Sequence, residues 1–135
     1  MKQAIRLRQR PLSPHLQIYR RHVTMVMSIL HRITGAALYL GALLLAWGLV
    51  ATAWSESAYG AFESFVGSPL GKIVLLGYTW ALAHHLLGGL RHLVWDTGRG
   101  LERAGANAIA WGTLIGSIML TAIVWGASHL IIWNS

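Results

Sequence analysis

Three histidines and an arginine lie within, or at the end of, an apolar stretch long enough to cross a membrane. The stretch is 82–98, L-A-H-H-L-L-G-G-L-R-H-L-V-W-D-T-G. Hydrocarbon strongly disfavours such side chains, so their presence in a span indicates a function. Imidazole is the usual axial ligand of a b-type haem, and paired glycines one turn away leave space for a flat macrocycle. The stretch therefore predicts a haem held within a bilayer.

The polar residues of this stretch follow a helical pattern. His85, Gly89, His92 and Asp96 are four, three and four residues apart, which places them within about 60° of arc on one helix face. His84 and Arg91 make a neighbouring stripe. We therefore expect the first four residues to face a common site.

Two interpretations of the histidine doublet follow. In the functional one, His85 is the axial ligand, and Gly88 and Gly89 relieve crowding beside the porphyrin. In the other, a buried neutral imidazole makes an interhelical hydrogen bond and the glycines only allow close helix packing. His84 is the rival ligand, but it points about 100° away from the stripe. Packing or hydrogen bonding is the favoured role for His84.

A second polar group occurs in S-I-L-H-R-I-T-G, residues 28–35. Ser28 and Arg32 are four residues apart and share a helix face. The guanidinium of Arg32 suits either a haem propionate or a quinone carbonyl, with the Ser28 hydroxyl as a second donor. The alternative is that Arg32 snorkels to the headgroups. His31 is offset by about 100°, where ligation and propionate contact are both open.

Composition limits the classes of protein. The 135 residues are 55% hydrophobic and only 11% charged, and there is no cysteine. The chain therefore holds one domain and cannot itself ligate an iron–sulfur cluster, form a disulfide or attach a c-type haem. The net charge of +7 is spread between apolar spans, so it argues against nucleic-acid binding.

Three segments are long enough to span a bilayer as helices. They run over about 23–53, 70–95 and 106–133, which predicts an all-α membrane protein with three transmembrane helices, up-down-up, in a domain at 23–135. Residues 1–22 form an expected basic cytoplasmic tail. Basic residues on alternate loops put the N-terminus and the 96–105 loop inside, and the 54–69 loop and the C-terminus outside.

The chain resembles the cytochrome b membrane-anchor subunits of succinate dehydrogenase in the bacterial four-subunit enzyme. The resemblance rests on R-P-L-S-P-H-L-Q-I-Y at 10–19, S-I-L-H-R-I-T-G at 28–35 and H-x-x-x-G-x-R-H-x-x-x-D at 85–96. It covers nearly the whole chain. One departure is the doublet His84–His85, where the family pattern has a single histidine.

The resemblance implies roles for particular residues. His85 corresponds to the axial ligand of haem b, with the second axial histidine supplied by the other anchor subunit. Ser28 and Arg32 match positions that line the ubiquinone pocket. His31, Arg32 and His92 would lie around the haem propionates. Asp96 falls at the cytoplasmic mouth of the quinone site.

The implied function is electron transfer from succinate to ubiquinone within a hetero-oligomer. The expected partners are a flavoprotein subunit, an iron–sulfur subunit, a second membrane anchor and membrane lipid, and the expected location is the bacterial inner membrane, with the C-terminus periplasmic. Two alternatives remain from the residues alone. The first is a cytochrome b anchor of another quinone-linked enzyme, of the fumarate reductase or hydrogenase type. The second is a haem-free membrane scaffold or small transporter subunit.

Overall fold

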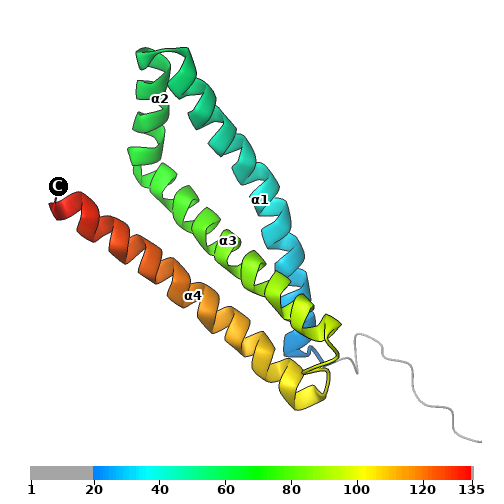
Figure 1. Cartoon of the computed structure of the whole chain (residues 1–135). Helices are drawn as coiled ribbons and strands as arrows, with labels where there is room; N and C mark the ends of the chain where they lie inside the picture. Colours follow the sequence, from blue (N-terminus) through cyan, green and yellow to red (C-terminus); the bar gives the residue numbers. More distant parts are fainter. Residues whose placement is uncertain (1–19, 135) are drawn as a thin grey trace, which may run out of the picture.

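The computed structural model describes residues 20–134, and these form four helices (Figure 1). They are α1 (Val23–Trp54), α2 (Glu56–Gly67), α3 (Pro69–Asp96) and α4 (Arg103–Asn134). Helices α1, α3 and α4 are long and apolar enough to cross a membrane. Successive long helices run in opposite directions. The all-α membrane fold expected from the sequence is confirmed. Most of the expected tail at 1–22, and the motif at 10–19, lie outside the described residues.

The connection between the first two spans is helical, whereas the sequence predicted a loop over 54–69. The hydroxyl of Ser55 accepts a hydrogen bond from the amide of Ala58 at 3.1 Å and so caps the start of α2. On α2, Phe62 and Phe65 pack against Trp47 of α1, with ring centroids 5.2 and 5.4 Å apart. The 12-residue helix is too short to be recognised as a span. It bridges the ends of α1 and α3 where these helices diverge (Figure 1).

The start of α3 is fixed by its cap. Ser68 accepts a hydrogen bond from the amide of Gly71 at 3.0 Å, and Pro69 occupies the first turn. This arrangement confirms the helix start expected near Pro69.

The α3–α4 connection turns through Gly98 and Gly100, which have φ of 76° and 67°. The indole of Trp95 donates to the carbonyl of Gly100 at 3.1 Å and closes this turn. The start of α4 therefore lies beside the start of α1, where His22 and Arg103 line one pocket.

The interior contains mainly small and polar side chains, while large aliphatic side chains cover the outside. Buried residues include Ala51, Ala81 and Ala110, whereas residues such as Leu43 and Ile73 are exposed. This distribution suits hydrocarbon as the surrounding solvent, because close helix packing there depends on small residues. In the G-x-x-x-G pair at 112–116, Gly116 meets Leu87 of α3 and Gly112 has no neighbour. Only one of the two glycines therefore serves helix contact.

Candidate functional site

Two histidines from different helices meet between α1 and α3. The rings of His31 and His85 are stacked, with centroids 4.0 Å apart and planes 3° from parallel. The Nδ1 atom of His85 lies 3.1 Å from the carbonyl oxygen of His31 and 3.5 Å from the hydroxyl of Thr34. A carbonyl can only accept, so Nδ1 carries the hydrogen. The neutral ring then has its lone pair on Nε2, the form that binds a metal.

Two glycines make this stack possible. A Cβ at Gly35 would lie 2.9 Å from Cε1 of His85, and a Cβ at Gly88 would overlap the ring of His31. Each helix therefore presents a glycine to the histidine of the other. The prediction that Gly88 makes room for a porphyrin is wrong, because that space is filled by His31 of the same chain.

Gly89 behaves differently. A Cβ at Gly89 would meet nothing within 4 Å, so packing within the described residues does not require a glycine there. Gly89 and His85 line an open groove of about 400 Å³ together with Leu86, Leu90 and Leu93. An imidazole whose Nε2 has no hydrogen-bond partner among residues 20–134, at the side of an apolar groove, is a donor set that fits a haem, since the macrocycle is flat and apolar and needs an axial nitrogen.

His84 lies about 100° around α3 from His85 and does not line this groove. It is completely buried, its ring lies 5.3 Å from that of Trp80, and neither ring nitrogen has a hydrogen-bond partner. Of the packing or hydrogen-bonding role expected for His84, the described residues therefore show the packing and no hydrogen bond. Arg91 is also buried, at 2% exposure, and its guanidinium lies over the ring of Trp95 at 5.1 Å.

The remaining sequence-predicted residues lie towards the same end of the helices. His92 is exposed, and its ring is 5.3 Å from that of His31. Ser28 is half-buried and Arg32 is exposed, so both can reach a group outside the chain. Asp96 is exposed at the last residue of α3. The structure brings His31, His85 and His92 together and leaves His84 apart from them.

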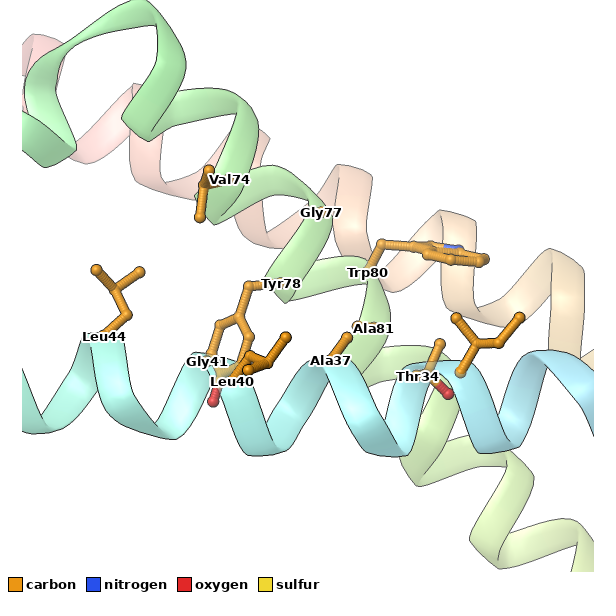
Figure 2. Close-up of a pocket in the computed structure, with 11 residues that line it drawn as sticks. Thr34, Ala37, Leu40, Gly41, Leu44, Val74, Gly77, Tyr78, Trp80 and Ala81 are labelled. Atoms are coloured by element: carbon orange, nitrogen blue, oxygen red, sulfur yellow. The ribbon is translucent and has the colours of Figure 1, made fainter.

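A larger pocket of about 470 Å³ lies between α1 and α3, beyond the stacked histidines (Figure 2). Tyr78 crosses from α3 to Gly41 of α1, and Trp80 and Thr34 lie at the other end of the pocket. Its lining contains no histidine and no charged residue. Among the described residues it therefore offers no axial histidine.

Sequence analysis missed Thr34, Gly35 and the carbonyl of His31 as parts of the site. Gly35 lies four residues after His31 and shares its face of α1, but spacing along one helix does not show which residue of another helix meets it. Its role depends on the register between α1 and α3, which one sequence does not reveal.

Comparison with known proteins shows the family of this chain. Residues 6–124 match the family described as the succinate dehydrogenase/fumarate reductase transmembrane subunit. The chain is 46% identical over 114 residues to the succinate dehydrogenase cytochrome b556 subunit of Paracoccus denitrificans, which covers 84% of this chain and 88% of the relative. The corresponding subunit of Rickettsia felis is 37% identical over 117 residues, or 87% and 91% of the two chains.

The chain is also similar to a eukaryotic protein. The mitochondrial succinate dehydrogenase cytochrome b560 subunit of Sus scrofa is 41% identical over 96 residues, covering 68% of this chain and 56% of that protein. The family match spans most of the three long helices, including the histidine stack and the groove beside it. The chain therefore belongs to the family of succinate dehydrogenase/fumarate reductase transmembrane subunits.

Proposed function

We propose that this protein is the cytochrome b membrane anchor of a succinate dehydrogenase and holds one haem b for transfer of electrons to ubiquinone. The single observation that carries the proposal is the environment of His85. Its Nδ1 is held by the carbonyl of His31 at 3.1 Å, and the ring lines an apolar groove beside Gly89. When bound, the haem supplies a one-electron carrier; the protein supplies the ligand and its orientation.

His85 is the proposed axial ligand, in preference to His84. Both nitrogens of His84 are enclosed within the fold, whereas His85 borders the open groove. The hydrogen bond from Nδ1 fixes the ring orientation and increases the electron density at Nε2, as partners of ligating histidines generally do. In the part of the chain that the structure describes, no second histidine lines this groove, so the proposed source of the other axial nitrogen is a second anchor subunit that covers it.

His31, Arg32 and His92 are the proposed neighbours of the haem propionates. The ring of His92 lies 5.3 Å from that of His31, and both His92 and Arg32 are exposed. Cationic and N–H donors of this kind hold carboxylates through charge-assisted hydrogen bonds.

Ser28 and Arg32 are the proposed donors to ubiquinone. They share a face of α1, one half-buried and the other exposed. A hydroxyl and a guanidinium directed at quinone oxygens stabilise the negative charge that develops when electrons arrive. Asp96, exposed at the end of α3, lies at the proposed mouth of this site and is placed to exchange protons with water.

The proposed setting is the bacterial inner membrane, with the start of α1 and the α3–α4 connection on the cytoplasmic side. Arg20, Arg21, Arg99 and Arg103 gather at that end and are exposed, which fits the positive-inside rule. A flavoprotein and an iron–sulfur subunit are the proposed partners there, because this chain has no cysteine for a cluster of its own.

The proposal is tested by purifying the complex through this chain from its native membrane. We expect a flavin-containing subunit, an iron–sulfur subunit and a second anchor to co-purify, with about one b-type haem per complex. We also expect succinate to reduce added ubiquinone. Purification of the chain without haem or flavin would contradict the proposal and favour the haem-free scaffold.

A further inference from the structure

Arg91 is a buried charge without a counter-charge in the described residues. It is 2% exposed, and its Nε and Nη1 atoms are enclosed without a hydrogen-bond partner. The nearby acidic residues Asp96 and Glu102 are both exposed, and neither forms an ion pair with it in the part of the chain that the structure describes. The Trp95 ring at 5.1 Å offsets only part of the cost of burial. An enclosed cation of this kind calls for an anion from outside the chain.

A groove of about 250 Å³ runs past Arg91 between α3 and α4. Apart from Arg91 and Thr113 its walls are apolar, formed by Leu87, Leu90 and Val94 of α3 and by Ile109 and Gly112 of α4. Leu90 and Val94 are exposed, so the groove opens to the outside of the helix bundle. A Cβ at Gly112 would meet nothing within 4 Å, and the space above this glycine is therefore free for an occupant.

This groove shares the wall residue Leu90 with the proposed haem groove but lies on another face of α3. Arg91 follows His85 by six residues, so it lies about 120° around α3 from it, on the side packed against α4. The second anchor that supplies the other axial ligand must cover the face of His85. With the second anchor on that face, the α3–α4 groove is left facing lipid. Only this placement of the second anchor rests on the proposed function.

The position of Arg91 along α3 matches the edge of a bilayer leaflet. It lies five residues before the last residue of the helix, which is about 7.5 Å at 1.5 Å per residue. At this depth a headgroup phosphate that enters the groove meets the buried guanidinium, because Arg91 lines the groove. Guanidinium also binds phosphate by paired hydrogen bonds, and acyl chains suit the apolar walls.

We propose that the α3–α4 groove binds one anionic phospholipid, with its phosphate on Arg91 and an acyl chain over Gly112. The test uses the detergent-purified complex, washed free of lipid and titrated with dioleoylphosphatidylglycerol or dioleoylphosphatidylcholine while bound lipid is counted by native mass spectrometry. The wild type should prefer phosphatidylglycerol by about tenfold, and Arg91→Gln should reduce this preference to about twofold. Arg99→Gln, which changes an exposed arginine of the α3–α4 connection, should leave it unchanged.

Gly112→Leu tests the groove while Arg91 is kept. The added side chain enters open space, so the helix pair should form normally and phosphatidylglycerol affinity should fall about tenfold. If Arg91→Gln does not assemble, the phosphatidylglycerol affinity of Gly112→Leu still tests the proposed lipid site. Three results would overturn the proposal: unchanged phosphatidylglycerol affinity in both variants, displacement of the lipid by inorganic phosphate alone, or loss of the second anchor from Arg91→Gln with lipid binding intact. The last would assign the counter-charge to a carboxylate of that anchor.

Discussion

The imidazole rings of His31 and His85 stack at 4.0 Å, and the backbone carbonyl of His31 accepts the Nδ1 hydrogen of His85 at 3.1 Å. One helix thus determines both the tilt and the tautomer of a histidine on another. If His85 binds iron, α1 sets the properties of the metal without contacting it.

Gly35→Ala should disturb the proposed ligand without removing it. The new Cβ would lie 2.9 Å from Cε1 of His85, so the ring must move by a few tenths of an ångström. We expect a haem-containing complex with a shifted midpoint potential and altered low-spin electron paramagnetic resonance signals. Gly126→Ala, where a Cβ has no neighbour, is the matched control and should behave as the wild type. Identical spectra for both variants would argue against ligation by His85.

Gly89→Leu should prevent haem binding while the fold is kept. Its side chain projects into the groove beside His85, and nothing within 4 Å opposes the Cβ. We expect the chain to insert into the membrane at normal abundance but with the haem content, measured as pyridine haemochrome, largely lost. Gly126→Leu adds the same volume elsewhere and should retain its haem. A full haem complement in Gly89→Leu would show that the groove is not the binding site.

Arg32→Leu should impair quinone reduction selectively. A hydrogen bond from a charged donor contributes about 1.5–3 kcal/mol, so kcat/KM for ubiquinone should fall roughly 10- to 100-fold. Oxidation of succinate by a water-soluble artificial acceptor should be unchanged, because that reaction does not use the anchor. Ser28→Ala should give a smaller loss of the same kind. Equal losses with both acceptors would instead indicate faulty assembly.

Ser68→Ala should weaken the start of α3. The hydroxyl of Ser68 accepts from the amide of Gly71 at 3.0 Å, and loss of such a cap costs about 1 kcal/mol. Unfolding of the chain in detergent micelles, followed by circular dichroism, should show this decrease in the free energy of unfolding. Ser57→Ala, an exposed serine within α2, should change it very little. Equal free energies of unfolding for the two variants would show that the Ser68 cap does not stabilise α3.

The sequence predicted the three spans well because hydrocarbon requires about 20 apolar residues for each crossing. It also placed His85, Gly89 and His92 on one helix face, since that depends only on spacing along a single helix. The role of Gly88 was predicted wrongly, because the ring that fills the space comes from His31 on another helix. Helix α2 was missed because its Ser- and Glu-containing sequence is typical of a polar loop, and its aromatic contacts with Trp47 are tertiary.

The proposed ligand is tested most directly by the reduced-minus-oxidised absorption spectrum of the complex purified through this chain, recorded for wild type, His85→Ala and His84→Ala. We predict a b-type α-band in the wild type that is lost or shifted in His85→Ala. The band should persist in His84→Ala, because that ring is completely buried and packs on Trp80 of the same helix. An unchanged band in His85→Ala, or no b-type band in the intact wild-type complex, would contradict the central claim.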